Sequence, residues 1–503
     1  MRSGSIRAVL VFAAAAPLFS AEPLDIGNRR QLFIDHRFMA SRKNVELKVH
    51  PPRKTGDIIV RSERPWTLGG YSCVLKDGDV YHLWYLVAGC VAYARSKDGI
   101  HWELPQAGTV EINGAARHNI VMGSGHGDVK GNVNGLMVFL DPNAPRDQRF
   151  RLVANPHDEG QMIQIFSSPD GVLWKRTYRN VLRYTDPKHH LDSQNTIIWD
   201  ERLRKYVAFA RRNLRRQGST MRSIVRAESP TLRHFPDVEQ CQVVFRPDAG
   251  DPEYGGVSAV DWYTNGVMRY PWADDVYLMF PAEYFHYGRY LGDFRGAAPV
   301  NAGALDTRLA TSRDGIHWER YNRKPFVRLG MTGDFDARRI YISYGVAPAL
   351  NGNELYMYYH GTSDTHGWGR NQANNDLLAK AGLAPTGPSA ISRLVLRRDG
   401  FVSASAAYAG GEFTTPALRF SGRELVLNVD TSAAGTLRVE IQDPQGHPYP
   451  GFALADCVDV HTANSVNRVV CWRGASDVAP LAGKPVRLRF VFRDTDLYAF
   501  QFR

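Results

Sequence analysis

The sequence lacks the signatures of most metal, nucleotide and membrane functions. After residue 20 no stretch approaches the roughly 18 apolar residues of a membrane span. There is no Gly-x-x-x-x-Gly-Lys-Ser/Thr phosphate loop, no His-Glu-x-x-His zinc motif and no Gly-x-Ser-x-Gly nucleophile elbow. The few cysteines, five in number, show no metal-like spacing. We therefore expect no metal and no cofactor, and no membrane span in the mature chain.

The N-terminal residues indicate export. Two arginines precede the apolar run 8–19, and small residues follow it, which is typical of a secretory signal peptide. A buried N-terminal helix is the alternative. We expect residues 1–21 to be a signal peptide and the protein to be periplasmic or extracellular. In that oxidising compartment Cys457 and Cys471 lie close enough in sequence to form a disulfide, although buried thiols are equally compatible with the spacing.

The chain is basic. It has 62 Lys and Arg against 51 Asp and Glu, a formal net charge of +11. Such an excess favours anionic polymers such as uronic-acid or sulfated glycans, although arginine-rich surfaces also occur without a ligand. Export and the lack of a nucleic-acid-binding motif argue against nucleic acid.

The clearest internal repeat is the motif Ser-x-Asp-Gly-x-x-Trp. Its copies occupy residues 96–102, 168–174 and 312–318, with a degenerate copy at 229–235. Each copy follows a short predicted strand. The aspartate accepts backbone hydrogen bonds, the glycine supplies a left-handed backbone and the tryptophan folds onto the sheet, so the motif predicts a hairpin turn. We expect it to join the third and fourth strands of a propeller blade, and its aspartates to be structural.

A second repeat predicts the number of blades. Strand–turn–strand hairpins precede the motif copies at 71–86, 136–154, 196–211, 257–280 and 340–360. The sequence thus predicts an all-β chain with a five-bladed β-propeller over residues 22–404, which a strand at 32–35 helps to close. Short alternating strands over 405–503 predict a small β-sandwich, either a carbohydrate-binding accessory domain or a structural buttress.

These repeats resemble the five-bladed β-propeller glycosidase clan, which includes invertase-like fructan hydrolases and arabinan- and xylan-trimming enzymes. The chain resembles the exported bacterial proteins named glycosyl hydrolase family 32-like, over roughly residues 30–400. It lacks the invertase Trp-Met-Asn-Asp-Pro-Asn-Gly, Arg-Asp-Pro and Glu-Cys signatures, so fructan activity is unsupported. The resemblance implies a carbohydrate partner, with an anionic one left open.

A glycosidase needs two carboxyl groups, one to protonate the leaving oxygen and one to attack or to activate water. In a propeller these groups belong at the starts of the innermost strands and in the loops at the same end. The dense polar segment 189–195 leads into a predicted inner strand. We predict Asp192 as nucleophile or base, with His190, Gln194 and Asn195 as hydroxyl-binding neighbours. A hydrogen-bonded turn is the alternative.

The fourth predicted blade offers two further acids. Asp261 lies near the start of its inner strand, and Glu283 follows the second strand beside aromatic residues that favour a raised pKa. We predict Glu283 as general acid and Asp261 as a further catalytic carboxylate, with a surface-loop glutamate as the alternative for Glu283. Further substrate-binding candidates are Arg212, Asp306, Asp336, Arg338 and His360. Arg338 is a candidate for binding a carboxylate or sulfate, or else forms a structural ion pair.

Three hypotheses follow for function. The first is a glycoside hydrolase acting on a polysaccharide or oligosaccharide through a carboxylate pair. The second is a non-catalytic glycan-binding propeller. The third is a polysaccharide lyase, in which His190 or His360 and a tyrosine abstract a proton beside a uronate that an arginine neutralises.

Overall fold

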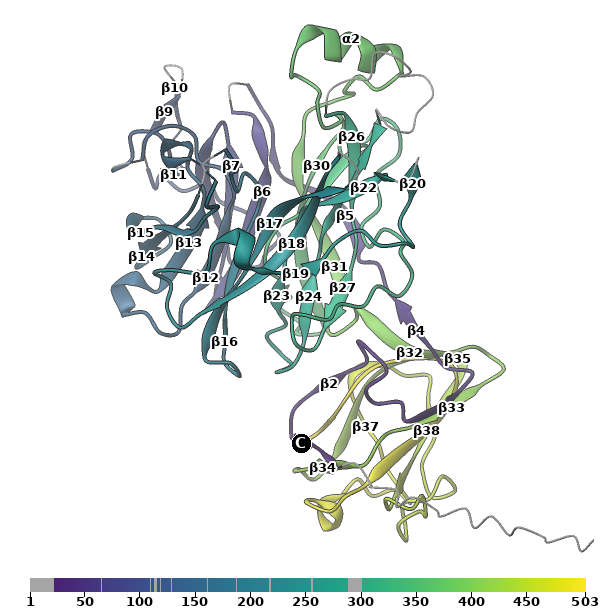
Figure 1. The fold of residues 1–503 in the computed structure, drawn as a ribbon. Helices are drawn as coiled ribbons and strands as arrows, with labels where there is room; N and C mark the ends of the chain where they lie inside the picture. Colours follow the sequence, from purple (N-terminus) through teal and green to yellow (C-terminus); the bar gives the residue numbers. More distant parts are fainter. Residues whose placement is uncertain are drawn as a thin grey trace, which may run out of the picture.

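The computed structural model describes residues 22–503 except 65, 109, 113–114, 118, 128, 161, 187, 217–218, 255–256 and 288–300. The predicted signal peptide therefore lies outside the described residues. The chain is mostly β and forms a propeller-like unit and a second unit that contains the C-terminus (Figure 1). Each unit has a large buried core. In the described ranges, no helix has the length and apolarity needed to cross a membrane.

The first part of the propeller-like unit follows the predicted repeat. Among the described strands, three antiparallel four-stranded sheets succeed one another. The first holds β6 (Leu68–Asp77), β7 (Val80–Val87), β8 (Cys90–Ser96) and β11 (Ile120–Met122), and the second holds β12 (Met137–Leu140), β13 (Phe150–Ala154), β14 (Ile163–Ser168) and β15 (Lys175–Leu182). The third holds β16 (Thr196–Asp200), β17 (Lys205–Arg216), β18 (Ser219–Ser229) and β19 (Gln242–Phe245). Each sheet begins with the predicted inner hairpin. In each, the Ser-x-Asp-Gly-x-x-Trp copy or its degenerate form lies between the third and the fourth strand.

The remaining strands do not separate into two further blades. One sheet runs through β22 (Val260–Thr264), β25 (Ala282–His286), β26 (Gly303–Thr307), β28 (Arg339–Ile342), β30 (Glu354–Thr362), β31 (Ala390–Arg397) and β5 (Arg53–Arg61). Its eighth strand, β29 (Ala347–Pro348), pairs with β30. Leu305 pairs in parallel with Arg339 and joins what the repeats predict as blades four and five. A smaller sheet holds β23 (Met268–Arg269), β24 (Tyr277–Met279) and β27 (Ala310–Ser312). The described pairing therefore gives four blade-like sheets, not five separate ones.

The strand that closes the ring differs from the predicted one. β5 pairs with β31 at the outer edge of the eight-stranded sheet. The prediction that residues 32–35 close the ring is wrong, because β2 (Gln31–Leu32) pairs with β38 (Arg487–Phe502) instead. The physical reason is burial. An outermost strand has a largely exposed pattern like that of β5, whereas Leu32 and Phe33 are buried.

The second unit combines both ends of the chain. β35 (Leu425–Gln442) and β38 pair along most of their length. In the described part of the chain, the nine-stranded sheet around them also holds β2, β3 (Ser41–Lys43), β4 (Glu46–Val49), β32 (Val402–Ala406), β33 (Gly411–Thr414), β36 (Val460–His461) and β37 (Asn464–Val469). β1 (Leu24–Gly27) pairs in parallel with β34 (Leu418–Phe420). Cys457 and Cys471 are unbonded, as are the other cysteines, all of which lie in described ranges.

The repeated motif forms the predicted turn. In the third copy, the Asp314 carboxylate accepts hydrogen bonds from the backbone N–H groups of Ile316 and His317, each at 2.8 Å. Gly315 has a φ of 73°, in the left-handed region that only glycine adopts readily. The Trp318 ring packs edge-on against a neighbouring ring, with a centroid distance of 6.2 Å to Phe209. The motif aspartate thus holds a turn.

Asp314→Ala should lower the free energy of unfolding by about 1–2 kcal/mol, because backbone donors lose their acceptor. Burial raises the pKa of Asp314, but bonds from His317 and the turn backbone outweigh it and lower the pKa from 3.8 to about 2. The stabilisation is therefore present above pH 4 and fades as the pH falls towards 2. Urea denaturation at several pH values measures it. Asp79→Ala, at an exposed turn position, is the control, and an equal loss there would contradict the role of the turn.

Candidate functional site

Side chains from three inner strands meet in the propeller-like unit. The ring centroids of Tyr71 on β6 and Tyr341 on β28 are 6.0 Å apart, and those of Tyr263 on β22 and Tyr341 are 5.9 Å apart. His360 on β30 stacks on Tyr341 at 6.2 Å, and the His366 ring lies 5.1 Å from Tyr263. We call these five residues the central cluster. The three tyrosines were missed from the sequence, because aromatic residues in strands usually indicate core packing.

Asp192 lies beside the central cluster. Its carboxylate forms an ion pair with Arg211 on β17 and lies 3.4 Å from the Nε2 atom of His190. The charges of Asp192 and Arg211 both act on the Tyr71 hydroxyl. The Asp192 side chain is 33% exposed and that of His190 is 48% exposed. Of the three predicted catalytic carboxylates, only Asp192 combines an arginine partner with open access.

The two amides next to Asp192 are bound to the backbone. Gln194 is buried and donates hydrogen bonds to the carbonyl oxygens of Ser72 at 3.3 Å and Leu136 at 2.9 Å. Asn195 is buried, donates to the Ser193 carbonyl at 2.8 Å and accepts from the Arg211 N–H at 3.0 Å. Both predicted hydroxyl-binding amides therefore satisfy the protein's own backbone groups.

Asp261 is enclosed rather than accessible. Its carboxylate lies 2.9 Å from the Arg222 guanidinium and 3.0 Å from the His286 ring, and only 2% of its side chain is exposed. Burial raises the pKa of Asp261, but Arg222 and His286 outweigh that effect and lower it. The guanidinium also lies over the rings of Tyr263 and Tyr284, at 5.1 and 5.3 Å. Asp261 is thus an ionised group buried under a cation and aromatic rings.

Glu283 faces the opposite side of the same strands. Asp261 pairs with Tyr284, whereas Glu283 pairs with Trp262 and with Asp306. Because side chains alternate along a strand, Glu283 and Asp306 point away from the face that carries Asp261 and Tyr284. The sequence predicted that Glu283 and Asp261 act in one site. The structure instead places them on opposite faces of the strands. The missing information was the pairing register.

Glu283 and Asp306 share one arginine. The Arg308 Nε atom lies 2.8 Å from a Glu283 oxygen and 3.4 Å from an Asp306 oxygen. Burial raises the pKa of Glu283 despite the Arg308 charge. Burial likewise raises the pKa of Asp306 to about 7, against the opposing effect of Arg308. Asp306 is therefore a carboxylic acid that keeps its proton close to neutral pH.

Three of the other predicted binding residues have structural partners. Asp336 is buried, 2.6 Å from the Lys54 ammonium and 2.9 Å from the Tyr359 hydroxyl. Arg338 donates to the carbonyl oxygens of Ser363 and Gly382. Arg212 donates to the Cys241 carbonyl at 3.4 Å. None of these contacts involves a second residue of the predicted binding set.

His360 is a member of the central cluster but is shut off from solvent. It is 3% exposed, and neither ring nitrogen has a hydrogen-bond partner among the described residues. Burial and the charge of Arg339 lower the pKa of His360 to about 3. Arg339, not the predicted Arg338, lies at this cluster, where it pairs with Asp364. His360 is therefore a neutral and buried side chain.

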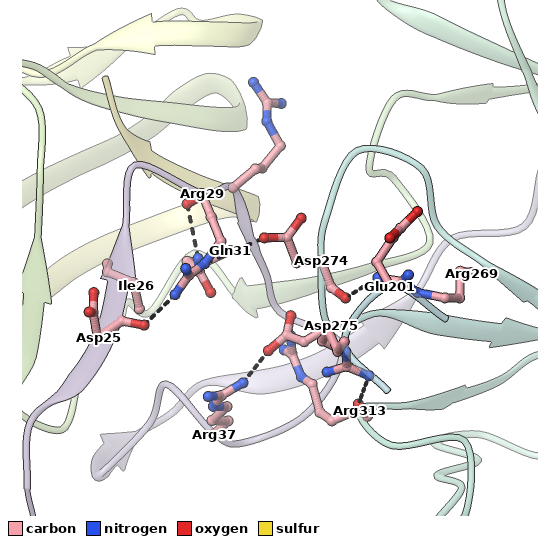
Figure 2. A pocket seen from close by; sticks show the side chains of 12 residues that line it. Asp25, Ile26, Arg29, Gln31, Arg37, Glu201, Arg269, Asp274, Asp275 and Arg313 are labelled. Atoms are coloured by element: carbon pink, nitrogen blue, oxygen red, sulfur yellow. Dashed lines mark hydrogen bonds and ion pairs between the residues drawn. The ribbon is translucent and has the colours of Figure 1, made fainter. Parts of the chain in front are cut away.

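A cavity of about 530 Å³ lies away from these residues, between the N-terminal segment and turns of the propeller-like unit (Figure 2). Arg313 lies 2.9 Å from both Asp35 and Asp275, and Arg37 also contacts Asp275. Arg29 lies 3.6 Å from Asp274. Most arginines that line this cavity are held in ion pairs, so it is an ion-paired junction between the two units. Over the described ranges, no group of three or more His, Cys, Asp or Glu side chains is placed to hold a metal ion.

Comparison with known proteins gives likenesses of fold. No protein-family model and no curated protein matches the chain. A solved structure titled "Glycoside hydrolase" has a TM-score of 0.46 and 13% identity, over 69% of this chain and 92% of that one. A thermostable family-43 glycoside hydrolase has a TM-score of 0.43 and 15% identity, over 69% of this chain and 96% of that one. A family-32 β-fructofuranosidase of Bombyx mori has a TM-score of 0.38 and 9% identity, over 93% of this chain and 95% of that one. The predicted resemblance to β-propeller glycoside hydrolases is confirmed, and it concerns the fold alone.

Arg222→Met should lower the free energy of unfolding by about 3–5 kcal/mol, because it leaves the buried Asp261 carboxylate without its cation. The double variant Arg222→Met/Asp261→Leu should recover a large part of that loss, since both charges are gone. Urea denaturation of the single and double variants measures the coupling. Additive losses would contradict a buried ion pair.

Asp306→Asn should change how stability depends on pH. The folded pKa of about 7 exceeds the ordinary value of 3.8, so the folded protein favours the protonated acid. The charge of Asp306 therefore opposes folding increasingly as the pH rises from about 4 to 7, with a slope of at most about 1.4 kcal/mol per pH unit. The variant should gain stability relative to the wild type over this range in urea denaturation. A difference that is constant with pH would contradict the assignment.

Proposed function

We propose that the protein is an exported glycoside hydrolase whose reactive carboxylate is Asp192. The observation that supports this most directly is the position of that group. It is a partly exposed carboxylate, bound to Arg211, beside a cluster of tyrosines and histidines from several inner strands. Within the cluster Tyr263 and His366 are partly exposed, and such rings near a charged, accessible group suit a sugar, which offers both apolar ring faces and hydroxyl groups.

In this proposal Asp192, held in place by its ion pair with Arg211, attacks the sugar or activates water. His190, 3.4 Å from Asp192 and half exposed, is placed to bind a substrate hydroxyl group beside it. Glu283 has no part in this step, because it faces the other side of β25. Asp261 and Arg222 act as a fixed buried support below Tyr263 and Tyr284.

The proposal includes the finer architecture. The eight-stranded sheet would contain the fourth and fifth blades of a five-bladed ring, because β23, β24 and β27 extend β22, β25 and β26 towards the motif turn at 312–318. The second unit would be a β-sandwich accessory domain. Export to the periplasm or the medium depends on residues 1–21 and on the signal-peptide pattern they carry.

A non-catalytic glycan-binding protein is the second candidate. The observation that favours it is that Asp261 and Glu283 are buried and bound to arginines, with 2% and 9% of their side chains exposed. A binding site needs no second accessible carboxyl group. Binding of a polysaccharide without release of new reducing ends would favour this candidate over the hydrolase.

Asp192→Asn should reduce hydrolysis by about 10²–10⁴-fold while leaving the fold intact, because the amide can neither attack nor accept a proton. The assay measures reducing ends released from arabinan, xylan, fructan and polygalacturonate. Asp77→Asn is the matched control, since Asp77 is also a partly exposed aspartate bound to an arginine, Arg149. Wild-type activity in Asp192→Asn, or an equal loss in Asp77→Asn, would overturn the proposal.

A further inference from the structure

We propose that the second unit binds the anionic group of an acidic saccharide in a cleft of about 550 Å³. The class of ligand, a saccharide, rests on the proposed function; the site does not involve Asp192. Lys43, Gly411, Glu412, Arg438 and Arg493 contribute to the lining. These residues come from the strand β3 near the N-terminus and from β33, β35 and β38, so the cleft exists only where the two ends of the chain pair.

The charges of the cleft are unevenly matched. The Arg438 guanidinium binds the Asp459 carboxylate at 2.9 Å, and the Glu412 carboxylate binds Arg489 at 2.6 Å. Lys43 and Arg493 form no ion pair with any described residue, and Asp459 acts on Arg493 only over a longer distance. Two cations are therefore left uncommitted while both lining carboxylates are occupied. This arrangement favours a carboxylate or sulfate group over a neutral sugar.

An exposed aromatic ring adjoins one of these cations, Arg493. Tyr408 is 66% exposed, whereas the phenylalanines of the second core, such as Phe413 and Phe492, are buried. The Arg493 guanidinium lies 5.6 Å from the centre of the Tyr408 ring. A tyrosine ring beside a guanidinium offers a flat apolar surface and an anion partner within one saccharide unit.

Two glycines hold the cleft in shape. A Cβ atom on Gly411 would lie 2.4 Å from the Asn44 carbonyl oxygen, so only glycine allows the β3 turn to approach β33. Gly410 has a φ of 84°, in the left-handed region. Across β33, Lys43 pairs with Glu412 and Glu412 pairs with Val491. The two cations thus lie on β3 and β38 of one sheet, with only β33 between these strands.

The test uses the full-length protein in affinity electrophoresis with four polymers: dextran, dextran sulfate, polygalacturonate and its methyl ester. Lys43→Gln and Arg493→Gln should each weaken binding to an anionic polymer by about tenfold, since each removes one charge-assisted bond. Tyr408→Ala should weaken it too, and Tyr408→Phe should not. Binding confined to polygalacturonate identifies a uronate, binding confined to dextran sulfate identifies a sulfate ester, and binding to both identifies an anionic group of either kind.

The control distinguishes binding in this cleft from the general electrostatic attraction of a basic protein to polyanions. A protein with net charge +11 is retarded by any polyanion, so only differences between variants of equal charge are informative. Arg468→Gln removes the same charge from an exposed strand position away from the cleft. Equal weakening by Arg468→Gln, equal binding to the neutral polymers, or no change in the cleft variants would each overturn the inference.

The outcome is distinguishable from failure of the proposed function. Binding is measured without turnover, in the wild type and in Asp192→Asn alike. Retained hydrolysis in Asp192→Asn overturns the proposed function and leaves the binding result standing. Arg493→Gln should leave hydrolysis of a short soluble oligosaccharide unchanged, because the cleft residues do not contact the central cluster.

Discussion

The propeller-like unit depends on satisfying the backbone groups that its inner strands turn towards the middle. No neighbouring strand reaches all of these groups, and an unpaired buried carbonyl is costly. Buried side-chain amides donate hydrogen bonds to these carbonyl groups instead. Gln194 bonds the carbonyls of Ser72 and Leu136, from two other sheets, and Asn265 bonds the carbonyls of Gln194 and Phe209. These four contacts tie successive sheets together and form the rigid base beside which Asp192 lies.

Arginines determine what each carboxylate in this region can do. Asp192, Asp261 and Glu283 pair with Arg211, Arg222 and Arg308. A buried carboxylate with its arginine is a stable charge pair, and it is unavailable to a substrate. Exposure separates the three: the Asp192 side chain is 33% exposed, against 2% and 9% for Asp261 and Glu283. The chemistry of the site therefore follows from access as much as from residue type.

The two units are joined by a short N-terminal stretch that contributes to both. Leu32 and Ile34 are buried in the core of the propeller-like unit, while the intervening Phe33 is buried in the second core. Alternation along an extended chain places neighbouring side chains on opposite faces, so one stretch can serve two cores. Arg313, from the last copy of the repeated motif, bonds Asp35 and Asp275 and fixes the same junction.

The sequence by itself determined the β class, the inner hairpins and the motif turns, because each depends on contacts within a few residues, such as those from Asp314 to Ile316 and His317. It also identified the polar segment around Asp192. Only the tertiary structure decided which strands pair across the whole chain: β5 with β31, and β2 with β38. It likewise decided the face on which Glu283 lies, through the register that pairs Glu283 with Trp262 and Asp261 with Tyr284. Contacts between residues dozens to hundreds of positions apart leave no local pattern, and these contacts set which charges are paired, buried or open to a ligand.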